Sequence, residues 1–303
     1  MFRRAERLRF SASVQGIGSI DPDEFSYEFA VDFTKPGVWT PDTNFVTGAS
    51  AFRLDYETYR QKGVLANVGL TQQFNRRLTG DLMLQASRSQ YEDDFGTRDF
   101  TIFSVIGRLA YDRRNNPFDA TRGYYLAASL QPFYEAEYGN FAARGTVEGR
   151  GYLSFGPEDR VTLAGRALVG SYGGASPAES PPDLLFFAGG GGSVRGYAYQ
   201  SIGIENFVFD DEEIVIGGRG LFETSTEVRW RFTDRWGGVG FVDTGLVTED
   251  GTLSGESDFR VGAGLGARFY TAIGVLRADV ATPVNRRDQD DYVALYLGIG
   301  QSF

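Results

Sequence analysis

The sequence predicts an all-β protein and, within that class, a transmembrane antiparallel β-barrel. Alternation of apolar and polar residues with period 2 returns about every 15 to 20 residues along the whole chain. The alternating segments are about 10–15 residues long, whereas strands of globular proteins are mostly about 5–6 residues and tilted membrane strands are longer. Since no apolar run reaches about 18 residues, a transmembrane helix is excluded.

The alternating segments can be followed from one end of the chain to the other. In the first, Leu8, Phe10, Ala12 and Val14 share one parity, while arginine and serine residues occupy the other. Charged residues keep to one parity in later segments too, as expected of strands with one lipid-facing and one lumen-facing side. About 14 strands are predicted, near residues 7–15, 24–33, 45–60, 62–74, 78–90, 99–112, 121–134, 140–155, 161–169, 222–232, 237–248, 259–269, 276–280 and 293–303.

Composition excludes several classes of function. The chain of 303 residues contains neither cysteine nor histidine, which removes disulfides, Cys/His metal sites, cysteine nucleophiles and histidine general bases. A net charge of -10 argues against nucleic acid as a partner, because phosphate binding requires concentrated positive charge. We therefore expect no enzyme activity, no cofactor and no metal. The first 20 residues alternate and lack the apolar core of a signal peptide.

The connections divide into short turns and one long interruption. Residues 75–77, 156–159 and 233–235 are short turns, and all fall on the same side of the predicted barrel. The longest connection, at about 173–219, falls on the opposite side if successive strands run up and down. Because outer-membrane barrels carry their long loops on the extracellular side, the sequence predicts an outer-membrane protein.

The long connection contains a glycine-rich stretch, FFAGGGGSVRGY, from Phe186 to Tyr197. Its four consecutive glycines allow positive φ angles and a close approach to other atoms. Arg195 follows them and is the first arginine of the connection. A buried guanidinium requires carboxylate partners, because an uncompensated ion in a medium of low dielectric constant is very costly.

Two downstream strands supply such partners. Parity places Glu227 with the charged, inward-facing residues of its segment, and Phe241 and Asp243 share the inward parity of the next. A guanidinium can bridge two carboxylates and stack on an aromatic ring. The alternate glycines Gly262, Gly264 and Gly266 would leave room inside for the loop. We therefore expect the loop to fold into the lumen.

Several motifs carry a resemblance to a known family. FFAGG at 186–190 and SVRGY at 193–197, with Gly189, Gly190, Ser193, Val194, Gly196 and Tyr197, resemble the signature loop of the BamA/TamA superfamily of outer-membrane assembly and translocation barrels. Trp236-Gly237 leading to Phe241-Val242-Asp243 is similar to the strand that receives the loop arginine. The residues flanking the loop are more similar to those of the TamA branch.

The resemblance has several implications. Arg195 should contact Asp243, Phe241 and Glu227, and the protein should insert or secrete other outer-membrane proteins such as autotransporters. Its partners would be unfolded outer-membrane proteins, a bilayer with lipopolysaccharide, and a TamB-like inner-membrane protein. The family has 16 strands preceded by periplasmic POTRA domains. Residues 1–303 instead indicate one barrel domain without a POTRA pattern, and Met1 is expected to correspond to the family's third strand.

The last residue, Phe303, lies on the lipid-facing parity of the final predicted strand. A C-terminal aromatic residue there resembles the targeting signal that the outer-membrane assembly machinery reads. Any barrel strand can end in this way, however, so the residue alone does not identify a signal.

Other interpretations remain open at this point. The glycine-serine stretch has the composition of an inert flexible linker. Lumenal arginines such as Arg144, Arg150, Arg166, Arg268 and Arg277 are expected to form structural ladders with Glu148 or Asp279. The barrel as a whole could be a passive pore, a structural barrel or a two-partner secretion pore.

Overall fold

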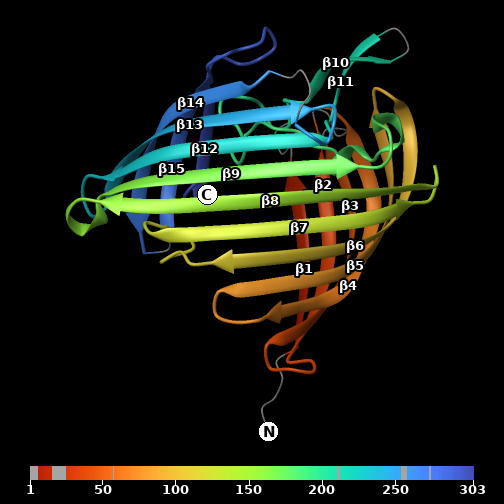
Figure 1. Ribbon diagram of the computed structural model, residues 1–303, viewed down its shortest axis with the longest axis horizontal. Helices are drawn as coiled ribbons and strands as arrows, with labels where there is room; N and C mark the ends of the chain where they lie inside the picture. The colour runs from red at the N-terminus through yellow and green to blue at the C-terminus, as the bar shows by residue number, and fades with distance from the viewer. Residues whose placement is uncertain (1–5, 16–24, 57, 210–211, 254–257, 273) are drawn as a thin grey trace.

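A computed structural model describes residues 6–15, 25–56, 58–209, 212–253, 258–272 and 274–303. Fourteen strands form one antiparallel sheet in chain order, except that β9 is followed by β12 (Figure 1). The strands of the sheet are β1 (Arg7–Gln15), β2 (Ser26–Pro36), β3 (Thr43–Asp55), β4 (Arg60–Gln73), β5 (Leu78–Asp93), β6 (Gly96–Asp112), β7 (Gly123–Glu135), β8 (Asn140–Phe155), β9 (Val161–Gly173), β12 (Gly220–Arg231), β13 (Trp236–Thr248), β14 (Arg260–Thr271), β15 (Gly274–Pro283) and β16 (Ala294–Ile299).

The all-β class and the 14 long strands are confirmed. The sequence missed a separate hairpin, β10 (Ile204–Phe209) and β11 (Glu212–Ile216), which brings the total to 16 strands. This hairpin lies within the long connection, together with the 3-10 turns η3 (Pro177–Glu179) and η4 (Pro182–Leu184); a further turn, η2 (Pro157–Asp159), joins β8 to β9. Among the described residues, no helix is long and apolar enough to cross a membrane.

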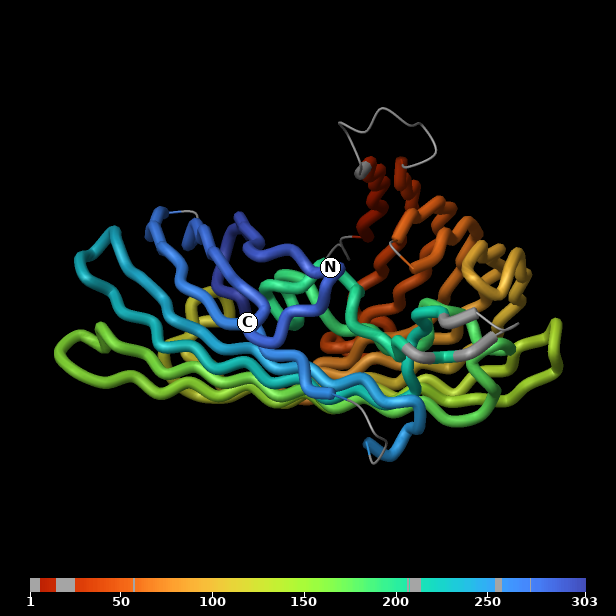
Figure 2. The backbone as a smooth tube through the Cα atoms, turned by 90° about the horizontal axis from the view of Figure 1, so that it is seen from above, coloured from red at the N-terminus to blue at the C-terminus, as the bar shows by residue number. Residues whose placement is uncertain are grey.

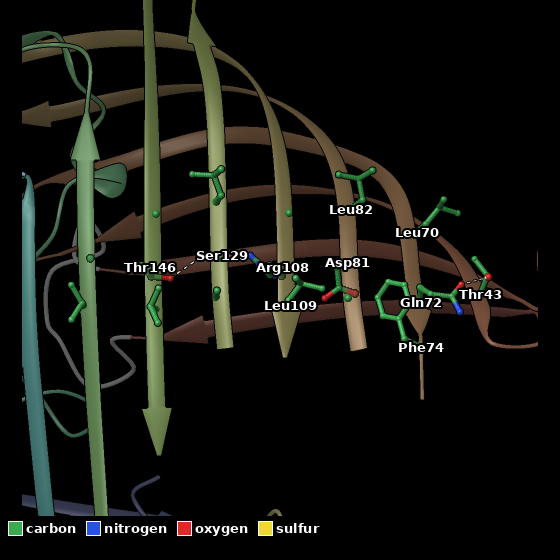
Figure 3. A pocket seen from close by; sticks show the side chains of 18 of the residues that line it. Thr43, Leu70, Gln72, Phe74, Asp81, Leu82, Arg108, Leu109, Ser129 and Thr146 are labelled. Carbon is green, nitrogen blue, oxygen red and sulfur yellow. Dashed lines mark hydrogen bonds between the residues drawn. The ribbon is translucent and has the colours of Figure 1, made fainter. Parts of the chain in front are cut away.

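Alternation along the strands separates two faces of the sheet. On β12, the outward Val228 and Trp230 are 50% and 56% exposed, whereas the inward Glu227 is fully buried. Leucine, valine and phenylalanine dominate the outward face, which is the pattern of a lipid-facing surface. A mainly apolar groove on this face is lined by Leu70, Leu82 and Leu109 and by glycines of neighbouring strands (Figure 3).

The sheet bends round a central space, and β1 and β16 are its two ends (Figure 2). Within the described residues, neither end strand pairs with the other, so each keeps one unpaired edge. The long connection runs through the space that the sheet surrounds, and the prediction that it folds into the lumen is confirmed.

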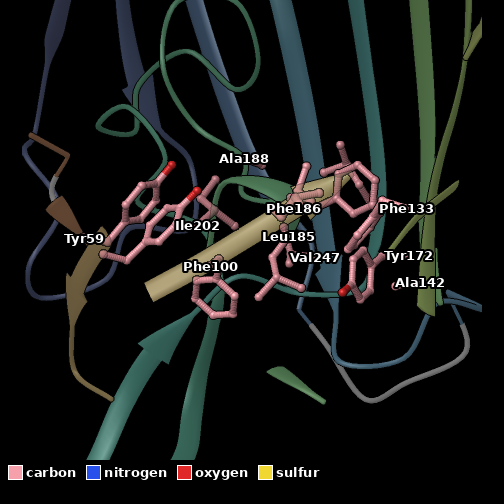
Figure 4. Close-up of a cluster of buried hydrophobic side chains, with 14 of the residues drawn as sticks. Tyr59, Phe100, Phe133, Ala142, Tyr172, Leu185, Phe186, Ala188, Ile202 and Val247 are labelled. Atoms are coloured by element: carbon pink, nitrogen blue, oxygen red, sulfur yellow. The ribbon is translucent and has the colours of Figure 1, made fainter. Parts of the chain in front are cut away.

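A buried apolar cluster anchors the long connection inside. Leu185, Phe186 and Ile202 of the connection belong to one cluster with Tyr59, which immediately precedes β4, and with strand side chains such as Phe100 (Figure 4). Full burial of a side chain such as Leu or Phe contributes about 1.5–3 kcal/mol. The cluster therefore gives the loop a hydrophobic attachment independent of its charged residues.

Candidate functional site: an arginine clasped inside the sheet

The turn that carries Arg195 depends on glycine backbone geometry. Gly189, Gly190 and Gly196 have φ angles of 109°, 94° and 105°, in the region that side-chain-bearing residues rarely adopt. The backbone N–H of Gly190 donates to the carbonyl oxygen of Tyr197 at 3.1 Å, which closes the turn. Inside it, the Ser193 hydroxyl accepts a hydrogen bond from the Gly189 N–H at 3.0 Å. The glycine stretch is therefore an ordered turn that projects Arg195.

Arg195 is 1% exposed and meets all three of its expected partners. Its Nε donates to Asp243 Oδ2 at 2.6 Å and its Nη2 to Asp243 Oδ1 at 2.9 Å, a two-pronged pairing. Its Nη1 donates to Glu227 Oε1 at 2.7 Å. The guanidinium carbon lies 3.4 Å from the ring centroid of Phe241. These four residues, Arg195, Asp243, Glu227 and Phe241, are called the loop lock below.

Strand register explains why the acceptors converge. Glu227 of β12 lies directly opposite Phe241 of β13, and Ser225 lies opposite Asp243. Residues two apart on one strand point to the same face. Both carboxylates and the ring therefore face the lumen from two neighbouring strands, as parity predicted.

The sequence missed a third acid in the site. Asp279 of β15 is fully buried and lies 3.5 Å from Arg195 Nη1, while Arg268 of β14 donates to its carboxylate through both terminal nitrogens. Arg268 and Arg277 were both among the arginines expected to pair with Glu148 or Asp279, and Arg277 is the farther of the two from Asp279, at 3.9 Å. The inward parity of Asp279 was visible in the sequence, but the choice between two arginines depends on cross-strand distances.

Arg229 completes the network by donating to Glu227 Oε2 at 2.8 Å. Arg195, Arg229 and Arg268 thus face Glu227, Asp243 and Asp279, so three positive charges balance three negative ones at this buried site. Charge balance matters because each unpaired ion would cost several kcal/mol in this environment.

The predicted glycines of β14 leave room for the site in three ways. A Cβ on Gly262 would lie 1.8 Å from the Arg195 carbonyl oxygen, so only this glycine borders the loop itself. A Cβ on Gly264 would meet the Phe241 ring at 2.4 Å, and one on Gly266 would meet Asp279 at 1.9 Å. Gly262, Gly264 and Gly266 therefore leave space for Arg195, Phe241 and Asp279, respectively.

A ladder of charged residues continues from the loop across β12, β9 and β8. The Ser193 hydroxyl donates to Glu223, which pairs with Arg166 at 2.9 Å; Arg166 and Arg150 both pair with Glu148, at 2.6 and 3.0 Å. The expected pairing of Arg150 and Arg166 with Glu148 is observed. Arg144 differs, because it lies over the Phe186 ring at 4.3 Å from the centroid.

A second attachment, which the sequence did not reveal, holds the loop near its outer end. Arg287, between β15 and β16, pairs with Glu205 of the long connection and with Asp290, and it donates to the Ser201 carbonyl oxygen at 3.0 Å. Arg260 pairs with Glu205 at 3.1 Å. We call Arg287, Glu205, Asp290 and Arg260 the outer clasp. Its residues lie in and beside loops, where no periodic pattern indicates which side chains meet.

The outer clasp is expected to loosen only in acid. Burial acts to raise the pKa of Asp290, but hydrogen bonds and charge from Arg287 outweigh it and hold the pKa below its ordinary value. A carboxyl group with a lowered pKa stabilises the fold above its unfolded pKa of about 3.9 and loses this contribution as the pH falls through the folded value. The hydrogen-exchange protection factors of residues 198–205 and 284–291, which are corrected for the intrinsic pH dependence of amide exchange, should therefore stay constant from about pH 8 to pH 5 and fall below about pH 4. Asp290→Asn should exchange faster throughout; a wild-type loosening between pH 5 and 8 would contradict the assignment.

Phe303 does not lie where the sequence predicted. Strand β16 ends at Ile299, and Gly300, with a φ of 93°, turns the last residues inward. The Phe303 ring packs against inward-facing Tyr152, 6.4 Å between centroids, and Arg229 donates to its carbonyl oxygen at 3.2 Å. The expected lipid-facing placement was wrong because it continued strand parity to the last residue. A role as a targeting signal stays a prediction.

The loop also touches the last strand of the sheet. The N–H of Gly196 donates to the Tyr296 hydroxyl at 3.0 Å, and this hydroxyl donates to the Tyr197 carbonyl oxygen at 3.2 Å. The turn carrying Arg195 is thus fastened to β12 and β13 by charge and to β16 by Tyr296.

A curved antiparallel sheet with an apolar outer face, a charged inner face and an in-folded loop is the architecture of an outer-membrane β-barrel. The chain belongs to the Omp85 superfamily: the Omp85 superfamily domain matches residues 1–303. Members of this family are assembly and transport barrels of the bacterial outer membrane and not enzymes.

Solved structures show the same fold. The chain is similar to BamA from Haemophilus ducreyi lacking POTRA domains 1-3, with a TM-score of 0.75 and 17% identity over 97% of this chain and 70% of that one. It is also similar to CdiB from Acinetobacter baumannii, with a TM-score of 0.61 and 16% identity over 98% of this chain and 54% of that one. CdiB from Escherichia coli gives a TM-score of 0.61 and 16% identity, over 97% and 56%. The chain thus spans a little over half of the CdiB chains.

Proposed function

We propose that this barrel assists the insertion or secretion of other outer-membrane proteins such as autotransporters, and that it is closest to TamA within its superfamily. The observation that carries the proposal is the buried loop lock, in which Arg195 joins an in-folded loop to Glu227 and Asp243. An inert tether would need neither the buried ion pairs nor the three glycines that accommodate them.

The unpaired edges of β1 and β16 supply a physical route for such a function. A free strand edge presents N–H and C=O groups that can pair with an incoming extended segment. The chemistry of this edge suits an unfolded outer-membrane protein, whose strands need backbone partners before they enter lipid. A TamB-like inner-membrane protein would act through POTRA domains, and the coding sequence upstream of Met1 would test this part of the proposal.

The assembly role is tested by reconstitution of the chain in lipid vesicles. An unfolded outer-membrane protein is added, and its folding is followed by protease resistance. Wild-type barrel should accelerate folding over empty vesicles, and Asp243→Ala, which removes the two-pronged partner of Arg195, should return the rate to that of empty vesicles. Arg150→Gln, which leaves Arg166 on Glu148, should keep the wild-type rate. Equal rates with and without wild-type barrel would refute the proposal.

Two other functions give different results in the same vesicles. A passive pore or structural barrel would show a large, steady, ohmic conductance, whereas a plugged assembly barrel should give small, flickering currents. A two-partner secretion pore, which the similarity to the CdiB barrels favours as second candidate, would export one dedicated passenger and leave other substrates unfolded.

A further inference from the structure

The outward face of β1–β6 carries a second apolar groove, which is separate from the groove in Figure 3 and, unlike it, is lined by an outward-facing arginine. The two have similar volumes, about 850 and 810 Å³. The second groove is lined by small side chains, including Ala66 and Ala86, and by Phe10, Phe29 and Phe103. These phenylalanines are 54% to 75% exposed. A groove of this shape and polarity fits a hydrocarbon chain.

A cationic side chain closes one end of the groove. Arg88 of β5 lines it, and Lys62 of β4 lies diagonally beside Arg88, because Lys62 is opposite Gln90 and Val64 is opposite Arg88. Diagonal neighbours on one face are about 7–8 Å apart, which two long side chains bridge easily. Both side chains are exposed and, within the part of the chain that the structure describes, neither forms an ion pair.

Three acids share this face, Asp55, Asp99 and Glu92, which lies opposite Arg60; among the described residues none of them forms an ion pair with Arg88 or Lys62. Asp55 is engaged with Arg60 at 3.2 Å, and Asp99 accepts a hydrogen bond from Gln90 at 3.1 Å. Below Arg88, the outward residues of β5 are Ala86, Leu84 and Leu82, all apolar. The cations thus stand at the upper edge of the apolar band, on the side where the long connection enters. This is the level at which lipid headgroups meet a membrane protein.

We infer that this groove is a binding site for a lipid with an anionic phosphate headgroup, with one acyl chain between the phenylalanines and the phosphate held by Arg88 and Lys62. Arginine and lysine bind phosphate oxygens through charge-assisted hydrogen bonds. The groove of Figure 3 serves as an internal comparison, because the cation that lines it, Arg108, lies opposite Asp81 and Ser129 on the inward parity of its strand, so this groove has no outward-facing cation. The inference goes beyond the proposed assembly function and does not depend on it.

The absence of cysteine from the chain allows a clean test with single-cysteine variants. Ala86→Cys places a fluorophore in the groove beside Arg88, and Ala128→Cys places one in the groove of Figure 3. Each labelled protein is reconstituted in phosphatidylcholine nanodiscs with a small fraction of quencher lipid. The quencher is a mid-chain nitroxide on either phosphatidic acid or phosphatidylcholine.

At position 86, phosphatidic acid should be bound about tenfold more tightly than phosphatidylcholine, as expected for charge-assisted contacts to a phosphate. The preference should disappear in the Lys62→Gln, Arg88→Gln double variant. It should persist in Arg76→Gln, Arg77→Gln, which removes the same charge from the opposite end of the barrel. At position 128, both lipids should quench equally.

Equal quenching by both lipids at position 86 would overturn the inference, and so would a preference that survives the loss of Lys62 and Arg88. Disulfide-linked dimers of the unlabelled Ala86→Cys protein in the same nanodiscs would assign the groove to a second copy of the chain and also refute it. Heat-modifiable electrophoretic mobility checks folding, which these outward substitutions should leave intact.

Discussion

Replacing Arg195 with alanine is expected to destabilise the barrel by about 3–5 kcal/mol, the cost of removing one partner from a buried ion network. The variant leaves Glu227, Asp243 and Asp279 with two arginines between them, where three and three were balanced. The long connection should then become accessible to chymotrypsin at Phe186 and Tyr197, both buried in the wild-type protein. Denaturant unfolding in detergent measures the first effect, and limited proteolysis the second.

Arg150→Ala is the matched control, since it also removes a lumenal arginine from a carboxylate. The Arg150 side chain is 26% exposed, and its partner Glu148 remains paired with Arg166 at 2.6 Å in the variant. The free energy of unfolding should therefore fall by less than about 1 kcal/mol. If Arg195→Ala unfolds like Arg150→Ala and keeps its loop protected from chymotrypsin, the loop lock does not hold the connection.

Gly262→Ala should displace the loop without altering any charge. Its Cβ would lie 1.8 Å from the Arg195 carbonyl oxygen, and the backbone of Gly262 is fixed between Asp243 of β13 and Pro283 of β15. Neither the loop backbone nor the strand backbone can move locally to relieve this contact. We therefore expect the free energy of unfolding to fall by about 3 kcal/mol, at the upper end for overpacking. The same unfolding and proteolysis measurements apply.

Gly165→Ala on β9 provides the comparison for this substitution. A Cβ at Gly165 meets no atom within 4 Å, so its unfolding free energy should change by no more than about 0.5 kcal/mol. Equal effects of the two substitutions would show that glycine content in the strands matters, rather than the space beside Arg195.

The strands and most of the loop lock could be predicted because the side-chain period of a strand is two residues, without drift over its length. Parity alone placed Glu227 and Asp243 on the inward face, and their neighbouring strands brought them together. Asp279 had the same inward parity, but its approach to Arg195 depends on the curvature of the sheet over β14 and β15.

The other differences between the sequence-based predictions and the structure lie outside the regularly alternating strands. The outer clasp joins Arg287 of the β15–β16 connection to Glu205 near the start of β10, and the conformation of such connections is set by contacts that no short sequence pattern encodes. The hairpin β10–β11 is short and lies within the long connection. Phe303 departs from its parity because Gly300 adopts a positive φ and turns the chain inward.

Tyr296 of β16 forms hydrogen bonds with Gly196 and Tyr197 of the turn that carries Arg195. The position of β16 and the attachment of this turn are therefore thermodynamically coupled, and the coupling acts equally in both directions. Any ligand or chain segment that binds better when β16 has moved away must weaken the attachment of the turn by the same factor. Conversely, a molecule that holds the turn in place raises the free energy needed to draw β16 aside. One hydroxyl group thus couples the interior of the protein to its membrane-exposed edge.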